Sequence, residues 1–195
     1  SFIAAGTSYS THCIPMVPFF LFYSMFGFQR VGDLIWAAGD IRARGFLIGG
    51  TSGRASLPGE GLQHQDGNSH LTAMTVPSVR AYDPTYAYEV SAIIRHGLNE
   101  MHEDNNDVIY YITVTNDKYA MPAKPKGSDE GIIRGIYRVR KAQDPAIHLA
   151  GSGAILPEAV EAADRLADDF GIQADVFSAT SWKALYDDAM RVERS

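Results

Sequence analysis

The sequence has a single cysteine, a shortage of positive charge and no long uninterrupted apolar run. One cysteine, Cys13, among 195 residues excludes an internal disulfide, and such sparse use is typical of a reducing compartment. Acidic residues outnumber basic ones, 23 to 17, for a net charge of −6. That charge, without a basic stripe, disfavours nucleic acid as a partner. We therefore expect a cytoplasmic protein that does not bind nucleic acid, with Cys13 as a buried thiol.

Residues 14–28 form the most apolar stretch, but they include Pro15 and Pro18. Prolines interrupt a helix, and the stretch is too short to cross a bilayer as one. We interpret it as a buried strand that leads into a helix, and we expect no membrane association. The chain starts at Ser1 inside an apolar segment and stops at Ser195 inside a helical pattern. We therefore expect it to be an internal fragment of a longer protein.

Apolar runs of strand length alternate along the chain with segments of helical period. Strands are predicted at 16–22, 46–50, 79–82, 108–114, 147–150 and 174–178, and helices from 24 to about 44, at 70–74, from 83 to about 102 and at 156–170. Asp83-Pro84 is a typical helix start, with a capping acid and a proline at the first helical position. This alternation predicts an α/β fold with a mostly parallel sheet and helices on both faces.

A stretch rich in proline, lysine and glycine near residues 120–129 indicates a linker. We divide the chain into a domain at 1–120, a linker at 121–145 and the beginning of a second α/β domain at 146–195. In that second part, Gly151-Ser152-Gly153 follows a strand. A dinucleotide-binding turn is an alternative, but Leu156 stands where its third glycine belongs.

The segment 59–70 combines two imidazoles and two acids in one polar loop after an apolar strand. Loops at strand ends carry much of the chemistry of α/β proteins. On the residues alone, His64 is more often a solvated or structural loop residue than a functional one. Asp66 suits a turn, and His70 suits capping or packing of the following helix. His64, Asp66 and His70 could form a metal set, but the fixed spacing of a zinc site is absent.

Six short motifs carry a resemblance to a known family. They are 6–11 (GTSYST), 23–30 (YSMFGFQR), 50–54 (GTSGR), 59–64 (GEGLQH), 82–84 (YDP) and 135–137 (GIY). In them the chain resembles the thiamine-diphosphate enzymes, specifically the homodimeric bacterial type of pyruvate dehydrogenase. The resemblance extends over nearly the whole chain and implies most of a pyrimidine-binding domain followed by the start of a transketolase-like C-terminal domain.

The resemblance also implies roles for particular residues. Tyr23 and Phe26 would line the pocket for the aminopyrimidine of the cofactor, with Phe20 behind them; on pattern alone, all three would be core aromatics. His64 would face the substrate side of the cofactor and hydrogen-bond the oxygens of the substrate, a task that suits an imidazole. Glu60 would help to shape the same pocket, or else be a surface acid.

The implied cofactors are thiamine diphosphate and Mg²⁺, whose Gly-Asp-Gly motif lies outside this chain. The implied partners are pyruvate, the second subunit of a homodimer, and the lipoyl domain and core of dihydrolipoyl acetyltransferase, so the fragment alone is expected to be inactive. Two alternatives stay open: another thiamine-diphosphate enzyme, such as a transketolase or a different 2-oxo acid dehydrogenase, or a non-catalytic assembly module. Gly61 favours a keto acid, because transketolases carry an acid there that binds a sugar hydroxyl.

Overall fold

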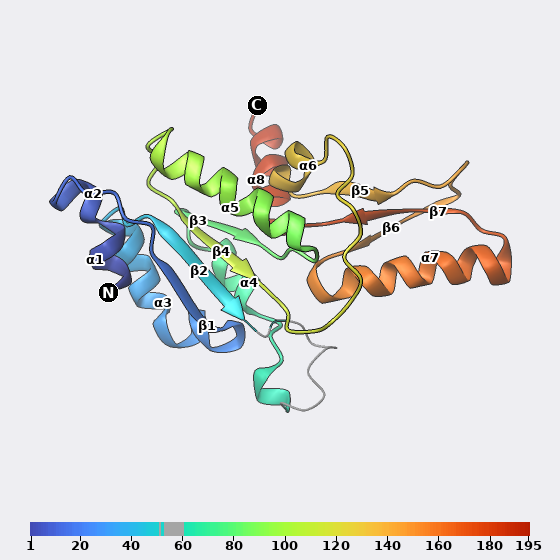
Figure 1. Ribbon diagram of the computed structural model, residues 1–195, viewed down its shortest axis with the longest axis horizontal. Helices are drawn as coiled ribbons and strands as arrows, with labels where there is room; N and C mark the ends of the chain where they lie inside the picture. Colours follow the sequence, from blue (N-terminus) through green and yellow to red (C-terminus); the bar gives the residue numbers. More distant parts are fainter. Residues whose placement is uncertain (51, 53–60) are drawn as a thin grey trace.

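The computed structural model describes residues 1–50, 52 and 61–195, and they form two β-sheets that lie one after the other along the molecule (Figure 1). The first sheet has the order β1-β2-β4-β3, and the second has the order β5-β7-β6. Each sheet is built from consecutive parts of the chain. The architecture is therefore α/β, as the sequence predicts.

All pairings in the first sheet are parallel. Its strands are β1 (Phe19–Tyr23), β2 (Gly45–Gly50), β3 (Val79–Tyr82) and β4 (Ile109–Thr113). Every residue of β4 is buried, which explains its uninterrupted apolar and β-branched sequence. Because the strands are parallel, their carboxyl ends meet at one edge of the sheet.

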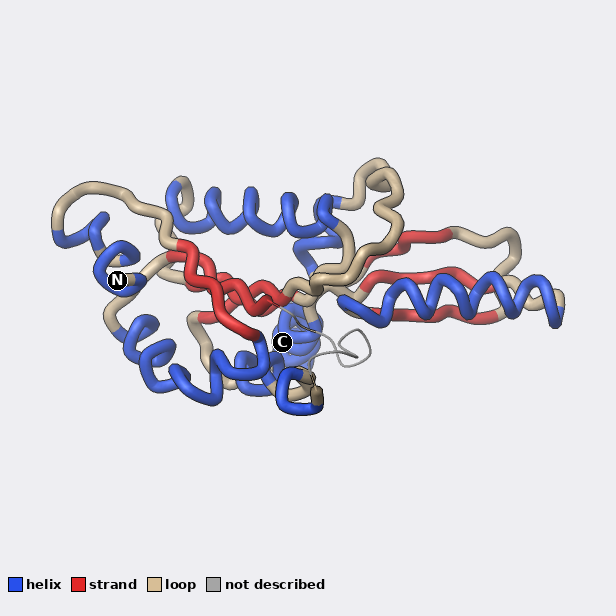
Figure 2. The backbone as a smooth tube through the Cα atoms, turned by 60° about the horizontal axis from the view of Figure 1, so that its bottom comes forward, coloured by secondary structure: helices blue, strands red, loops and turns tan. Residues whose placement is uncertain are grey.

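Helices cover both faces of this sheet, as the sequence predicts (Figure 2). The helices α3 (Ser24–Asp40) and α4 (Ser69–Met74) pack on one face, and α5 (Ala87–His102) packs on the other. Phe28 and Ile35 of α3 are buried against Leu47, whereas Ile93 of α5 lies in the core on the Phe46 side. Alternate side chains of β2 therefore belong to two separate hydrophobic cores, one on each face of the sheet.

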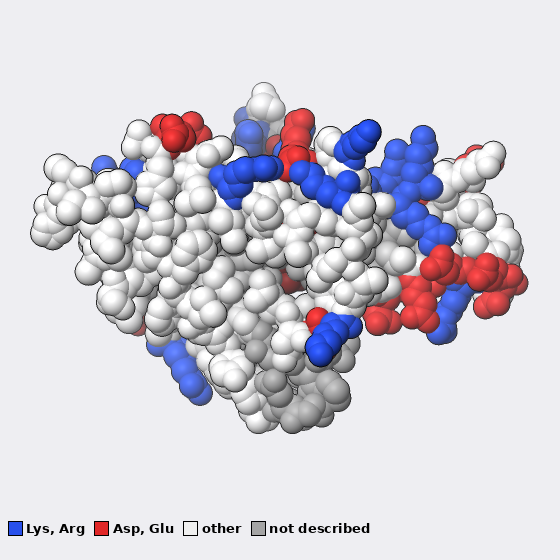
Figure 3. Space-filling view, in the orientation of Figure 1, with Lys and Arg blue, Asp and Glu red and all other residues white. Residues whose placement is uncertain are grey.

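The strand β1 differs from its expected form, since the sequence predicts a buried strand at 16–22. It lies at the edge of the sheet, beside the short helices α1 (Phe2–Gly6) and α2 (Ser8–Thr11). Leu21 is 70% exposed, and most of the other β1 residues are exposed too, on both faces of the strand. Figure 3 shows few charged side chains on the face over β1 and β2. Cys13, expected to be buried, is also exposed.

The second sheet is mixed. The strand β7 (Ala174–Ser178) pairs in parallel with β6 (Ile147–Gly151) and antiparallel with β5 (Tyr137–Arg140). The helix α7 (Leu156–Phe170) packs on β6 and β7 through Leu156, and α8 (Trp182–Glu193) follows β7. No helix in the described part of the chain is both long and apolar enough to cross a membrane.

The segment predicted as a linker, 121–145, contains ordered structure. The helix α6 (Asp129–Arg134) packs against α5, and β5 joins the second sheet. The three-part division of the chain itself stays a prediction. A short turn of helix and a four-residue strand leave too weak a periodic pattern to be seen beside the prolines and glycines of this stretch.

The start of α5 also differs from the expected one. The sequence places a capping acid at Asp83, whereas the helix begins at Ala87 with Tyr86 as its N-cap and Glu89 closing a capping box. Asp83 instead contacts the second unit, which we define as the second sheet with the helices α7 and α8: its N–H donates to the Thr180 carbonyl (2.8 Å). A tertiary partner has therefore replaced the local role that the sequence suggested for this residue.

Candidate functional site at the carboxyl edge of the first sheet

The candidate site lies where β1 and β2 end. β1 leads directly into α3, which carries Phe26 in its first turn, and β2 leads into the loop that carries His64 in a 3₁₀ turn, η1 (Leu62–His64). Tyr23 pairs with Gly50 at the last step of the β1–β2 ladder. The carboxyl edge of an open parallel sheet is where such folds bind ligands, and it brings these segments together here.

The rings of Tyr23, Phe26 and His64 form one cluster. Their centroids are 5.2 Å apart for Tyr23 and His64, 5.4 Å for Phe26 and His64, and 6.4 Å for Tyr23 and Phe26. All three pairs meet edge to face, a favourable arrangement of aromatic quadrupoles. Tyr23 is 51% exposed. The cluster therefore offers aromatic surface and an imidazole to a ligand from solvent.

Arg30 adds a cation to this cluster. Its guanidinium carbon lies 4.3 Å from the centroid of the Phe26 ring, within the range of a cation–π contact. The two residues are four apart on α3, so they share a face of the helix. We did not assign Arg30 a role from sequence, although this spacing carried the signal. The contact fixes the Phe26 ring that meets His64.

A kink in α3 separates the site from the rest of the helix. Val31 has non-helical backbone angles, φ −126° and ψ 16°, and Gly32 follows it, a residue that tolerates such departures. The segment from Ser24 to Arg30 thus takes its own direction at the strand end. This lets the Phe26 ring lie over the loop while later turns of α3 pack on the sheet.

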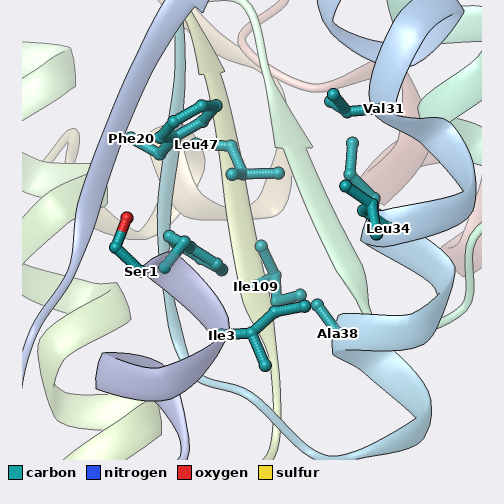
Figure 4. A pocket seen from close by; sticks show the side chains of 10 residues that line it. Ser1, Ile3, Phe20, Val31, Leu34, Ala38, Leu47 and Ile109 are labelled. Carbon is teal, nitrogen blue, oxygen red and sulfur yellow. The ribbon is translucent and has the colours of Figure 1, made fainter.

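Phe20 does not join the cluster. It lines a different cavity of about 190 Å³ between β1, α1 and α3, together with Val31 and Leu47 (Figure 4). Alternate residues of a strand point to opposite faces, so Phe20 and Phe22 share the face turned away from Tyr23. Their rings are 5.8 Å apart. A direct role behind Tyr23 and Phe26 therefore has no support in this geometry.

Of the remaining predicted residues, Glu60 lies outside the described residues. Gly61 has φ +77°, a conformation that favours glycine. Asp66 forms the turn expected for it: its carboxylate accepts hydrogen bonds from the Asn68 and Ser69 N–H groups (3.1 and 3.0 Å) and from the Ser69 hydroxyl. Burial raises the pKa of Asp66, but the bonds from Ser69 and Asn68 outweigh it and hold that pKa below its usual value.

His70 packs against the sheet, with its ring 5.3 Å from that of Tyr111 and Nε2 2.7 Å from the Thr113 hydroxyl. Asp66 and His70 both line a second cavity at this edge. Across the residues that the structure describes, no three histidine, cysteine or acidic side chains are arranged to hold a metal. The suggested set of His64, Asp66 and His70 is therefore not gathered around one point in the part of the chain that the structure describes.

Comparison with known proteins places the chain in a family. The middle domain of the pyruvate dehydrogenase E1 component matches residues 1–122, and the transketolase-like C-terminal domain matches residues 135–195. Pyruvate dehydrogenase E1 components of Pseudomonas aeruginosa and Escherichia coli K12 are 60% and 54% identical to the chain over its full length. The chain spans 22% of the length of each of these relatives.

Solved structures agree on the fold. Transketolase from Campylobacter jejuni superimposes with a TM-score of 0.69 over 88% of this chain and 26% of its own, at 17% identity. Transketolase from Leishmania mexicana gives 0.71 over 88% and 24%, at 18% identity. At such identities the likeness concerns the fold alone, whereas the sequence relatives are specific. The chain belongs to the pyruvate dehydrogenase E1 component family, with its middle domain at residues 1–122 and a transketolase-like C-terminal domain match at residues 135–195.

Proposed function

We propose that this chain is the part of a pyruvate dehydrogenase that binds the aminopyrimidine of thiamine diphosphate and places an imidazole beside the substrate. The whole enzyme would decarboxylate pyruvate and pass the acetyl group to the lipoyl arm of dihydrolipoyl acetyltransferase. The observation that carries the proposal is the contact of Tyr23 and Phe26 with His64 at the carboxyl edge of the sheet. The relatives, which are named as components of pyruvate dehydrogenase, support pyruvate as the substrate and a place in a multicomponent enzyme.

The residues present fit one part of the cofactor. An aminopyrimidine is a flat aromatic ring, and the half-exposed Tyr23 ring with the Phe26 face offers apolar surface of matching chemistry. Among the described residues no acidic cluster suited to Mg²⁺ accompanies it. We therefore assign the contacts with the diphosphate and the metal to other parts of the protein. Some of these parts would belong to the second subunit of a homodimer. The enzyme would act in the cytoplasm.

When bound, thiamine diphosphate supplies the stabilised carbanion needed to remove carbon dioxide from a 2-oxo acid. The chain's own residues bind and orient. Tyr23 and Phe26 exclude water from one side of the site, and Arg30 holds the Phe26 ring in place. His64, whose ring lies against these aromatics, can hydrogen-bond a substrate oxygen and act there as a general acid or base.

The test is His64→Ala in the intact enzyme, with pyruvate-dependent acetylation of a lipoyl domain as the readout. Loss of a general acid–base group costs about a hundredfold or more in rate, so we expect kcat to fall at least that far. His12→Ala, an exposed histidine near α2, is the matched control and should retain full activity. Undiminished turnover of the His64 variant would remove this residue from the mechanism.

Two alternatives have distinct outcomes. A transketolase or a dehydrogenase for another 2-oxo acid would prefer sugar phosphates or longer keto acids over pyruvate in a substrate panel. Gly61 supports the keto acid, because it offers no side chain to bind a sugar hydroxyl. An assembly module that has lost the cofactor site would turn over none of these substrates, and its full-length sequence would lack the Gly-Asp-Gly motif.

A further inference from the structure

A chain of hydrogen bonds connects the second unit to His70 in the helix α4. Ser152, at the end of β6, donates to Asp83 Oδ2 (3.0 Å), and the Thr113 hydroxyl lies 2.6 Å from Asp83 Oδ1. Thr113 in turn lies 2.7 Å from His70 Nε2. The chain thus runs Ser152–Asp83–Thr113–His70 across the junction between the two sheets, and Thr113 at its centre is 1% exposed.

The direction of each bond follows from the chemistry of the groups. The Thr113 hydroxyl has one hydrogen, and besides His70 its neighbours are the Asp83 carboxylate and the Tyr82 carbonyl, at 2.6 and 3.3 Å. Both of these groups can accept only. The Thr113 hydrogen is therefore donated to one of them, with the short charge-assisted bond to Asp83 preferred. Its oxygen is left to accept from His70 Nε2–H.

This fixes the tautomer of His70. A neutral imidazole carries one hydrogen, and if Nε2 holds it, Nδ1 must present a lone pair. The His70 ring lines a cavity of about 230 Å³, together with Asp83, Thr113, Ser152 and Trp182. That cavity lies at the same edge of the sheet as the aromatic cluster. A histidine ordered by a hydroxyl and a carboxylate follows the logic by which catalytic bases are oriented.

We propose that Asp83 and Thr113 are positioning residues that hold His70 with Nδ1 as a hydrogen-bond acceptor for an X–H group of a ligand in this cavity. The ligand class is a hydroxyl or a thiol, since the adjoining Asp66 and Asp83 carboxylates disfavour an anion. His70 lies six positions after His64, so two imidazoles serve one edge of the sheet with different surroundings. The role in turnover rests on the proposed function, whereas the fixed tautomer does not.

The first experiment reads the tautomer directly. The chain is labelled with ¹⁵N-histidine, the His70 signals are assigned from the His70→Gln spectrum, and the ring nitrogens are observed above the pH at which the ring is protonated. We expect a pyrrole-type Nε2 and a pyridine-type Nδ1. The opposite pattern, or an even mixture of tautomers, would overturn the proposal without any reference to enzyme activity.

Matched variants test the origin of this preference. Thr113→Val keeps the shape of the side chain but removes the acceptor, so the His70 preference should be lost. Thr75→Val makes the same chemical change at the exposed end of α4 and should leave the His70 signals unchanged. Ser152→Ala should also retain the tautomer, because the Thr113–Asp83 bond remains. A Thr113→Val spectrum identical to that of the wild type would contradict the relay.

The second experiment, in the intact enzyme, distinguishes two roles of His70: its hydrogen bond to Thr113 and the hydrogen bond that its Nδ1 would accept from the ligand. His70→Gln can still donate an amide N–H to Thr113 but lacks the Nδ1 lone pair, whereas His70→Asn places an amide oxygen near the Nδ1 position and loses the bond to Thr113. We expect kcat/KM to fall about tenfold in the Gln variant, the scale of one lost hydrogen bond, and less in the Asn variant.

Carbon dioxide release and lipoyl acetylation are followed separately. If the His70→Gln variant releases carbon dioxide more slowly, the group that donates to His70 Nδ1 is a hydroxyl derived from pyruvate. If only lipoyl acetylation is slower, that group is a thiol of the lipoyl arm. If the Gln variant keeps wild-type values in both steps while the Asn variant is impaired, His70 is an anchor only and its role as an acceptor is refuted. An intact wild-type enzyme inactive with pyruvate would refute the proposed function and leave the tautomer result standing.

Discussion

Two carboxylates join the first sheet to the second unit, and their surroundings differ. Glu89 is fully buried and accepts four hydrogen bonds, from the Thr85 and Tyr86 N–H groups and from the Tyr137 and Ser178 hydroxyls. Asp83 is half-buried and lines a cavity. The sealed carboxylate can serve stability alone, whereas the one beside a cavity can also order groups that meet a ligand.

The junction at Glu89 has more hydrogen bonds than the junction at Asp83. Burial and the Glu89 carboxylate raise the pKa of Tyr137, which therefore stays protonated and donates to Glu89. Because that hydrogen is committed, the bond of 2.7 Å between Tyr88 and Tyr137 must have Tyr88 as its donor. Backbone and side-chain donors from both units thus converge on one carboxylate. Satisfied buried networks of this kind are costly to disturb.

Breaking the Glu89 junction should have the largest effect. Glu89→Ala leaves four buried donors without their acceptor, and we expect the free energy of unfolding of the chain to fall by about 4 kcal/mol. Glu89→Gln should cost less, because the Tyr137 and Ser178 hydroxyls can rotate and accept from its amide. The measurement is urea denaturation followed by circular dichroism.

The exposed Glu103 provides the control, since Glu103→Ala should change stability by no more than about 0.5 kcal/mol. Equal losses for the Ala and Gln variants of Glu89 would show that the carboxylate charge, rather than the count of satisfied donors, holds the units together. If neither Glu89 variant lost stability, the role assigned to this junction would be contradicted.

The Asp83 junction can be tested through the glycine beside it. Gly153 has φ +50°, and a Cβ there would approach the Asp83 carboxylate oxygens to 2.6 Å. Gly153→Ala therefore combines backbone strain with displacement of that carboxylate, and we expect a loss of about 2 kcal/mol. Gly171→Ala is the matched control, with φ +66° and open space around the added methyl.

The Gly171 variant should cost about 1 kcal/mol, the strain of the left-handed conformation alone. The difference between the two variants then reports the contact with Asp83, and thermal unfolding of both in parallel measures it. Equal losses would mean that the Asp83 carboxylate moves aside freely. The half-buried junction would then be too soft to position Thr113 and His70.

The sequence predicted the sheets and the edge that holds the site, because these depend on local patterns. Apolar runs predicted all four strands of the first sheet, whereas the grouping of Tyr23, Phe26 and His64 was implied by the family resemblance and not by a local pattern. Side chains alternate between the two faces of a strand, and this rule already places Phe20 and Tyr23 on opposite faces of β1. The bond between Asp83 and Ser152 could not be predicted, since these residues are 69 apart in sequence and no local pattern relates them.

The smallest effect concerns the loop between the two histidines. Hydrogen bonds from Ser69 and Asn68 outweigh burial and lower the pKa of Asp66, so the ionised side chain stabilises the fold above about pH 4, its unfolded value. This stabilisation is lost as pH falls through the lower folded pKa.

Asp66→Asn keeps an acceptor but loses the charge. At pH 7 it should cost about 1 kcal/mol, and the gap to the wild type should close below pH 4. Urea denaturation of both chains between pH 3 and 7 measures that gap, with the exposed Asp33→Asn as a control that should show none. A gap that persists unchanged at pH 3 would mean that the Asp66 charge does not hold this turn.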